Sequence, residues 1–202
     1  MKKKMTWKNA EGTINDSLEH GVSFPHHKEP LVILNRQMAK CRRKEPFDSF
    51  ESLLVPRSEW NAVPQSKQPE PMETPISFIR YWKFTNTDSC RKKHECNFIL
   101  QDLQERHMSV GFGDIRFNFL IGGDGSIYEG RGWNSKPPDD PTYEYNTENH
   151  LEIGFIGDIR LKSKLYNAYR MQLQFESGHI LVDYGQKNNL ISKKLKCTWK
   201  EK

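Results

Sequence analysis

The residue whose surroundings best suit ligand binding is an arginine that stands between two glycines. In the stretch FNFLIGGDGSIYEGRGWN, residues 117–134, Arg131 stands between Gly130 and Gly132. A guanidinium is planar and can hold a carboxylate through two parallel hydrogen bonds, which a lysine cannot reproduce. Because neighbours without side chains leave little to cover it, we expect Arg131 to be exposed and to contact a ligand.

Histidines and cysteines are the next candidates, because they could hold a metal ion or act as a nucleophile and its base. The histidines of the ordered part, His94, His107, His150 and His179, form no close ligand pair. No elbow-like turn places a serine or cysteine beside a histidine and an acid. The segment CRKKHEC, residues 90–96, is too short for a zinc finger without a second pair, and fits either a small disulfide loop or two reduced thiols.

The composition suits one domain of ordinary size with a tail. The chain has 202 residues, of which 35% are apolar, and a net charge of +5. Its basic clusters at residues 1–4 and 41–44 are short and lack interleaved aromatic residues, so we expect no nucleic-acid partner. No early apolar stretch resembles a signal-peptide core, and none is long enough to cross a bilayer, so the sequence predicts neither a secretion signal nor a membrane span.

The first quarter of the chain differs from the rest. Residues 1–54 mix charges, histidines and prolines without a sustained apolar period, and we predict a disordered N-terminal tail there. Residues 55–202 carry the periodic patterns of an ordered domain, interrupted by a proline-rich connector at 66–75.

The elements that must position Arg131 follow from this periodicity. Residues 117–121 and 127–128 alternate around the turn GGDG and predict a β-hairpin that ends just before the arginine. We also predict strands at 76–84 and 150–159 and helices at 97–108 and 165–184. Strands separated by helices indicate an α/β fold.

The hairpin and its neighbours resemble the peptidoglycan recognition proteins, the animal relatives of the phage-type zinc amidases. RSEWNA at 57–62 is similar to the family's opening arginine-x-x-tryptophan-x-alanine motif, and LQERHM before GFGDIRFNFLIGGDGSIYEGRGWN is similar to its helix and hairpin. YNTENHLEIGFIGDI and LVDYGQKNNLIS extend the resemblance to about residues 56–195. It implies a central mixed β-sheet flanked by helices, the N-acetylmuramoyl-L-alanine amidase type 2 fold, shortened at its C-terminal end. The long N-terminus and degenerate C-terminus resemble the insect long forms, in particular the LA type.

In family members that are enzymes, two histidines and a cysteine hold zinc, which polarises the water that attacks the lactyl-amide bond. By the resemblance, Lys83 occupies the first histidine position and Pro141 the second, and the chain ends near the cysteine position, for which Cys197 is out of place. Phe117 replaces the catalytic tyrosine and has no hydroxyl. We therefore expect no catalytic residue, no amidase activity, and no metal or other cofactor.

The resemblance also assigns ligand contacts, because the family's groove holds a muramyl peptide. Members that prefer meso-diaminopimelic acid to lysine in the peptide stem carry a glycine-tryptophan pair before the hairpin and an arginine after it. Trp133 either lies against the ligand or packs in the core, and Asp114, Asn118 and Asp124 are expected to fix the turn and the strand ends. The implied ligand-binding residues are Gly111, Phe112, Arg131, Trp133, Tyr145 and Asn146, and the implied disulfide joins Cys90 and Cys96.

Three functions follow from the resemblance, in decreasing order of preference. The first is a non-catalytic protein that binds bacterial peptidoglycan fragments (muropeptides), of the diaminopimelic acid type, in innate immune signalling. The second is a regulatory module that pairs with other peptidoglycan recognition proteins without binding glycan, and the third is a zinc-dependent amidase. The compartment stays open, because the family and the disulfide indicate an extracellular or cell-surface protein and the absence of a signal or span indicates a cytoplasmic one.

Overall fold

The computed structural model describes residues 5–6, 49–84, 89–139, 149–157 and 164–201. These residues belong to one compact unit, Met1–Thr6 with Ser49–Lys202. Most of the predicted tail lies outside the described residues, so its disorder and the boundary between residues 54 and 55 stay predictions. A short helix, α3 (Phe50–Leu53), comes before that boundary, and the hydroxyl of Ser49 caps it by accepting a hydrogen bond from the Ser52 N–H group.

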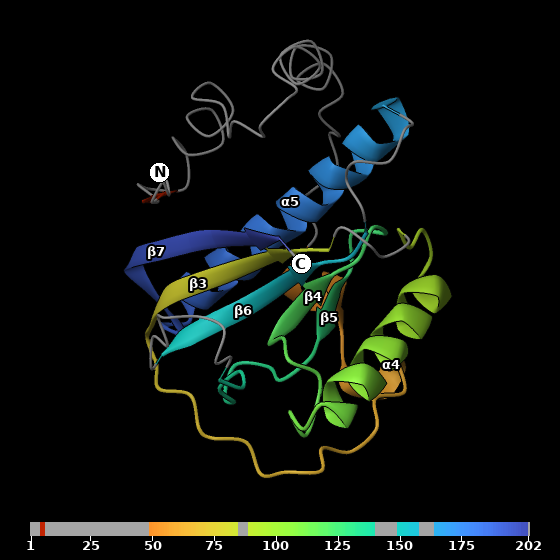
Figure 1. Ribbon diagram of the computed structural model, residues 1–202. Helices are drawn as coiled ribbons and strands as arrows, with labels where there is room; N and C mark the ends of the chain where they lie inside the picture. The colour runs from red at the N-terminus through yellow and green to blue at the C-terminus, as the bar shows by residue number, and fades with distance from the viewer. Residues whose placement is uncertain (1–4, 7–48, 85–88, 140–148, 158–163, 202) are drawn as a thin grey trace. The chain divides into compact units, whose positions relative to one another are not determined.

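The described strands form one mixed sheet (Figure 1). Its strand order is β1-β7-β3-β6-β4-β5-β2, and neighbouring strands are parallel except in the β1–β7 and β4–β5 pairs. The central mixed sheet predicted from the sequence is therefore confirmed. The strands are β1 (Met5–Thr6), β2 (Leu54–Val55), β3 (Ile76–Lys83), β4 (Phe119–Ile121), β5 (Ile127–Glu129), β6 (His150–Phe155) and β7 (Ile191–Glu201).

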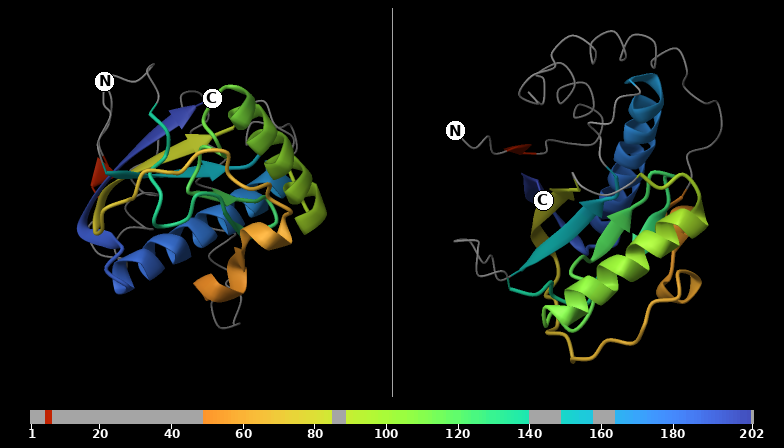
Figure 2. Two further views of the ribbon diagram at one scale, coloured as in Figure 1. Left: turned by 90° about the horizontal axis from the view of Figure 1, so that it is seen from below. Right: turned by 45° about the vertical axis from the view of Figure 1, so that its right-hand side comes forward.

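Two long helices lie on opposite faces of this sheet (Figure 2). They are α4 (Lys93–Ser109) and α5 (Lys164–Lys187), and a 3-10 turn, η1 (Arg57–Glu59), precedes β3. Both long helices were predicted, although α4 begins four residues before the predicted start at residue 97. Within the described part of the chain, no helix is both long and apolar enough to cross a membrane.

The sheet divides the apolar interior into two layers. On the α4 side, Trp82 and Leu120 join Leu100 and Leu103 of the helix in one buried cluster. On the α5 side, Tyr81 and Phe155 join an aromatic layer with Phe175 and Trp199. Successive residues of a strand point to opposite faces, so the neighbours Tyr81 and Trp82 pack in different layers.

The predicted hairpin is present as β4 and β5, which pair antiparallel. Asp124 fixes its turn, because the Asp124 carboxylate accepts hydrogen bonds from the Ser126 N–H group at 3.1 Å and from the Tyr128 hydroxyl at 2.9 Å. Gly125 takes a φ of +87°, a conformation that suits glycine. These contacts confirm the expected role of Asp124.

A disulfide closes the loop before α4 and joins Cys90 to Cys96, which confirms the pairing implied by the resemblance. Arg170 of α5 connects this loop to the hairpin turn, because its Nη1 donates to the carbonyl oxygens of Cys90 at 3.1 Å and Gly123 at 2.6 Å. A Cβ atom at Gly123 would stand only 2.4 Å from the Cys90 carbonyl oxygen, so this approach requires glycine.

Candidate functional site

Arg131 lies where the chain leaves β5. The N–H group of Gly130 donates to the Asn118 carbonyl and that of Arg131 donates to the Phe117 carbonyl, each at 2.9 Å, which holds this segment beside the residues that enter β4. A Cβ atom at Gly130 would stand 2.2 Å from the Phe117 carbonyl oxygen, and Gly132 takes a φ of +66°. The local backbone conformation therefore requires glycine at these two positions.

The Arg131 side chain is partly covered by backbone carbonyls. Its Nε donates to the Ile115 carbonyl at 2.7 Å and its Nη2 to the Phe112 carbonyl at 2.8 Å, while Nη1 lies 3.5 Å from the Lys136 carbonyl. The expectation of an uncovered guanidinium is therefore wrong. The covering residues belong to the loop 112–115, which lies earlier in the sequence, and the glycines beside Arg131 do not predict the position of that loop. Arg131 is half-buried.

These carbonyl oxygens accept hydrogen bonds from some of the guanidinium N–H groups and do not neutralise its charge. A guanidinium has five N–H groups, and three of them meet described carbonyls. No carboxylate of the described residues forms a salt bridge with Arg131. Burial lowers the pKa of this guanidinium, and Asp114 opposes that effect, but an arginine stays charged at any physiological pH. Arg131 can therefore still receive an anionic group from outside.

Asp114 fixes the loop that holds Arg131. Its buried carboxylate accepts hydrogen bonds from the Gln104 side chain and from the Ile115 N–H group, both at 2.7 Å. Arg57 forms a salt bridge to it at 3.0 Å and also donates to the Gly130 carbonyl at 2.7 Å. This clamp ties η1, α4, the loop and the exit of the hairpin together, which agrees with the structural role expected for Asp114.

Gly111 and Phe112 form the outer edge of the same loop. Gly111 is exposed with a φ of +91°, and a Cβ atom there would meet nothing within 4 Å. The half-buried ring of Phe112 lies 5.8 Å from the His107 ring and 5.9 Å from the Arg116 guanidinium. The structure thus places Phe112 and its neighbour Gly111 beside Arg131, and a ligand contact by these residues stays a prediction.

A buried ionic network lies beside this loop on the α4 face of the sheet. Glu152 of β6 is fully buried and accepts hydrogen bonds from Arg80 of β3 at 2.8 Å and from Arg116 at 2.6 and 2.9 Å. Burial alone would raise the pKa of the Glu152 carboxyl, but hydrogen bonds from Arg116 and His150 lower it to about 2. The Arg116 guanidinium also lies 4.4 Å from the centre of the Trp82 ring.

This network was not predicted from the sequence, although a signal was present. Arg80 and Glu152 are charged residues within the apolar runs ISFIRYWKF and HLEIGFIGDI, and a charge inside a buried strand usually has a partner. The register of β3 against β6 places the two residues opposite each other. Asn118 supports the network, because its side-chain oxygen accepts from the Glu152 N–H group at 2.9 Å.

Trp133 lies apart from Arg131, among the rings on the α5 face. Its ring centre is 4.7 Å from that of Phe119 and 6.2 Å from those of Phe50 and Tyr184. These contacts favour the alternative in which Trp133 packs in the core, and a ligand contact by this residue stays a prediction. Tyr145 and Asn146 lie outside the described residues.

The positions that the resemblance assigned to zinc chemistry are only partly described, because Pro141 lies outside the described residues. Lys83 ends β3 as a buried residue, paired with Phe155 of β6 and Glu201 of β7. Phe117 is fully buried and packs edge-on against Trp82 and Phe84. Among the described residues, one group has ligand atoms close enough for a metal, Cys90, Cys96 and Asp124, and its two sulfur atoms form the disulfide.

Comparison with known proteins gives a consistent set of relatives. No family model matches the chain. The chain is 36% identical over 149 residues to peptidoglycan-recognition protein LE of Drosophila melanogaster, a match that covers 71% of this chain and 42% of the relative. It is 32% identical over 137 residues to peptidoglycan-recognition protein 3 of Holotrichia diomphalia, a match that covers 65% of this chain and 71% of the relative. The chain thus spans less than half the length of the Drosophila relative.

Solved structures share the fold. The crystal structure of peptidoglycan recognition protein LE in complex with tracheal cytotoxin, a monomeric diaminopimelic acid-type peptidoglycan, has a TM-score of 0.62 and 30% identity, over 73% of this chain and 82% of that chain. The ectodomain complex of the recognition proteins LCa and LCx with bound tracheal cytotoxin has a TM-score of 0.60 and 25% identity, over 73% and 83%. The LA type stays a prediction.

Proposed function

The chain belongs to the peptidoglycan-recognition protein family, and we propose from this premise that it binds bacterial peptidoglycan fragments without cleaving them. We propose further that it prefers stem peptides with diaminopimelic acid and that it acts in innate immune sensing. The relatives LE and the LCa–LCx pair were solved with a fragment of this type, which supports the choice of ligand.

The observation that carries this proposal is the state of Arg131. Its side chain is held in one orientation by the carbonyls of Phe112 and Ile115, yet its charge meets no described carboxylate. Diaminopimelic acid differs from lysine by one additional carboxylate. An oriented cation with two N–H groups left over among the described contacts suits that group, because little conformational freedom remains to be lost on binding.

The proposed lack of catalysis rests on the residue types at the positions assigned to zinc chemistry. A lysine ammonium at position 83 has no lone pair for a metal while it is charged, and the proline at 141 offers no side-chain ligand. Phe117 has no proton to donate. These residues support a binding protein that requires no metal.

A second candidate function is a module that pairs with another member of the family. It is favoured by the exposed apolar surface beside α4, where the Phe98 side chain is 72% exposed and Val63 is 49% exposed, next to a hollow. The LCa–LCx complex supports pairing within the family. The residues that line the hollow are Asn61, Val63, Phe98, Gln101, Asp102, Gln104, Glu105 and Met108.

Isothermal titration of the purified full chain with two monomeric muropeptides tests the proposal. The ligands differ only in the third stem residue, diaminopimelic acid or lysine. We expect saturable binding of both and tighter binding of the first. Absence of heat with both ligands, from protein with a folded circular dichroism spectrum, would leave the pairing module as the better function, and sedimentation of the chain mixed with a second family member would then test that function directly.

A further inference from the structure

The disulfide at the start of α4 lies beside the carboxylate of Asp124. Cys90 precedes α4 and Cys96 lies in the first turn of that helix, whereas Asp124 belongs to the turn between β4 and β5. Their two sulfur atoms and a carboxylate oxygen all lie within 4.8 Å of one another. In the oxidised chain the two sulfur atoms are bonded to each other, and the carboxylate stands next to that bond.

Gly122 allows this close approach, because it has no side chain. A Cβ atom at position 122 would stand 2.9 Å from the Cys96 Sγ and 2.3 Å from the Asp124 Oδ1. The sulfur atom and the carboxylate oxygen therefore face the same point above the Gly122 backbone. A larger residue at this position would push the carboxylate away from the sulfur atoms.

Hydrogen bonds fix the orientation of the Asp124 carboxylate. Its Oδ1 accepts from the Ser126 N–H group at 3.1 Å, and its Oδ2 accepts from the Tyr128 hydroxyl at 2.9 Å. Burial and the charge of Asp124 raise the pKa of Tyr128, so this hydroxyl stays protonated and remains a donor. A carboxylate oxygen has two lone pairs, so Oδ1 can still bind a cation, and carboxylates that bind metals are typically oriented by such hydrogen bonds.

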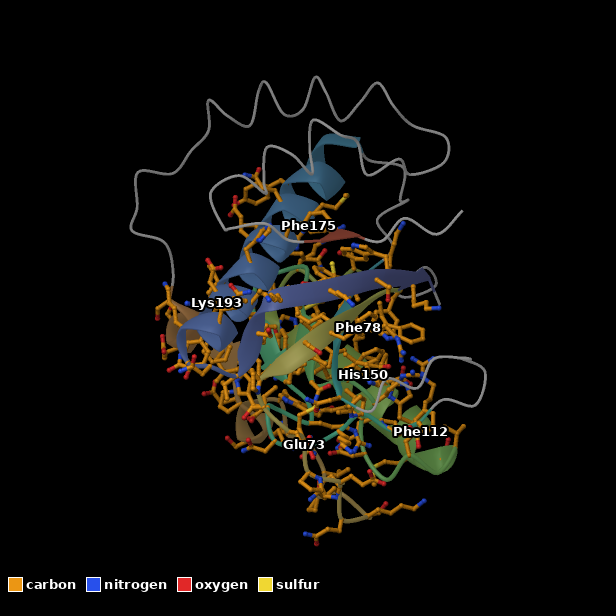
Figure 3. The ribbon with its side chains drawn as sticks, turned by 90° about the vertical axis from the view of Figure 1, so that its left-hand side faces the viewer. Glu73, Phe78, Phe112, His150, Phe175 and Lys193 are labelled. Carbon is orange, nitrogen blue, oxygen red and sulfur yellow. A yellow bond between two sulfur atoms is a disulfide. The ribbon has the colours of Figure 1, made fainter. Side chains whose placement is uncertain are left out.

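The two segments are also held together by contacts that do not involve sulfur. Arg170 of α5, the helix marked by Phe175 in Figure 3, donates to the carbonyl oxygens of Cys90 at 3.1 Å and Gly123 at 2.6 Å. Backbone hydrogen bonds close the hairpin turn itself. The loop and the turn should therefore stay adjacent when the disulfide is opened.

Reduction turns the bridge into two potential metal ligands. A dithiol reductant breaks the Cys90–Cys96 bond, each cysteine gains one electron and one proton, and the reductant closes its own disulfide. A divalent metal ion that binds both sulfur atoms then displaces these two protons. Cytosolic proteins keep their thiols reduced, so this chemistry is available to any copy of the chain in a reducing compartment.

The ligand atoms select zinc among the common biological cations. Calcium and magnesium take oxygen ligands, whereas Zn²⁺ accepts thiolate sulfur together with carboxylate oxygen in a tetrahedral arrangement. Ligand atoms about 2.0–2.3 Å from a tetrahedral ion lie about 3.3–3.8 Å from one another, so separations within 4.8 Å require only small side-chain rotations. Asp124 is half-buried, which leaves room for water as the fourth ligand.

We propose that Cys90, Cys96 and Asp124 bind one zinc ion when the disulfide is reduced. The ion links the start of α4 to the hairpin turn, so the same segment is held by a covalent bond in an oxidising compartment and by a metal in a reducing one. None of the residues assigned to the muropeptide or to amidase chemistry takes part. The inference therefore does not rest on the proposed function.

Metal retention by the full chain tests this inference. The chain is purified with the disulfide closed, and a second sample is reduced with a dithiol and freed of the reductant without air. After dialysis against zinc and then buffer, the reduced sample should retain one Zn²⁺ per chain and the oxidised sample none. With Co²⁺ as the probe, the reduced sample should show thiolate-to-cobalt charge-transfer absorption and the visible bands of a tetrahedral site.

Matched variants assign the ligands. C90S/C96S should lose both the zinc and the cobalt spectrum, whereas C41S/C197S, which removes the other two cysteines of the chain, should keep them. Y128F removes the hydroxyl that orients Asp124 and should weaken zinc binding by the reduced chain roughly tenfold or more. Zinc should raise the midpoint of urea unfolding of the reduced wild type but not that of C90S/C96S.

The inference would be overturned if the reduced wild type, with a folded circular dichroism spectrum, retained no metal. Retention that persists in C90S/C96S, or that disappears in C41S/C197S, would place the ion elsewhere and have the same consequence. Equal retention by the oxidised and the reduced wild type would also overturn it, and would point to the positions assigned to amidase chemistry. Muropeptide titration of the oxidised samples tests the proposed function separately, because C41S/C197S and the wild type should bind that ligand equally.

Discussion

Arg131 and Ile115 are joined by a hydrogen bond of 2.7 Å, in which the arginine Nε donates to the isoleucine carbonyl oxygen. This bond fixes the plane of the guanidinium against the loop that Asp114 clamps. The same side chain therefore stabilises the loop and remains charged toward the outside. A variant at position 131 must therefore be tested both for its stability and for its affinity for the ligand.

Replacing Arg131 by alanine should weaken binding of the diaminopimelic acid ligand by about 1.5–3 kcal/mol, or roughly tenfold or more, because a hydrogen bond to a charged group is lost. Affinity for the lysine-type ligand should change little. R131K should recover only part of the discrimination, since it keeps the charge but not the planar fork. Calorimetric titration with both ligands measures the ratio of the two affinities.

The variant R106A serves as the control for this series, because Arg106 pairs with Asp102 on the exposed surface of α4. It should leave both affinities unchanged. R131A should also unfold more easily, since it leaves the Ile115 and Phe112 carbonyls without their donor. If only the unfolding free energy changes and the affinity ratio stays that of the wild type, Arg131 has a structural role alone.

Removal of the Glu152 charge should destabilise the protein by about 3–5 kcal/mol, because E152Q leaves two buried guanidinium groups without their carboxylate. Urea unfolding at pH 7 measures the difference. A change below about 1 kcal/mol would mean that other groups around Arg80 and Arg116 compensate for the loss of the Glu152 charge.

The same carboxyl predicts a pH dependence of stability. Its pKa is about 2 in the folded chain and about 4.3 when unfolded, so the unfolded chain binds the proton more readily. The stability that Glu152 contributes should be fully present above about pH 4.3 and lost as the pH falls toward 2. Unfolding free energies of wild type and E152Q should therefore converge over this window and run parallel above it.

The disulfide should contribute roughly 2 kcal/mol, because Cys90 and Cys96 close a short loop with a sequence separation of 6. Urea unfolding of C90S/C96S measures this loss. Peptide mapping of oxidised protein, alkylated without reduction, should recover the two cysteines as one linked peptide. Recovery of both as alkylated thiols would contradict the assignment.

Purified protein supplied with zinc and then dialysed should retain no stoichiometric metal and should not cleave muropeptides. Lys83 and Phe117 lack the groups that the reaction requires. Elemental analysis and mass spectrometry of the products measure both properties, with an enzymatic family member assayed in parallel. One tightly held zinc ion per chain would refute the non-catalytic assignment.

Local periodicity predicted the elements whose side chains repeat in a regular way. The strand at 76–84, the hairpin and the helix at 165–184 correspond to β3, β4 with β5, and α5. The strand β7 was missed, although Leu195 and Cys197 are buried and alternate with exposed lysines, because those lysines lower the apolar content. Its pairing with β3 is also distant in the sequence.

The site was predictable only where neighbours in the sequence decide it. Asp124 shapes its own turn, so its role could be predicted from the residues next to it in the sequence. The cover over Arg131 and the pairing of Arg80 with Glu152 depend on residues far away in the chain, brought together by strand register. Periodicity carries no information about register between distant strands, and no pattern within either strand contains these contacts.

The basic strand also affects how the protein behaves at high concentration. Among the described residues, β1 pairs with β7 at Lys196 and Cys197, and any part of that edge left unpaired would be a template for a strand from another molecule. The exposed lysines oppose such growth, because identical edges repel one another. A polyanion that neutralises these lysines would remove this protection and favour association of the edges.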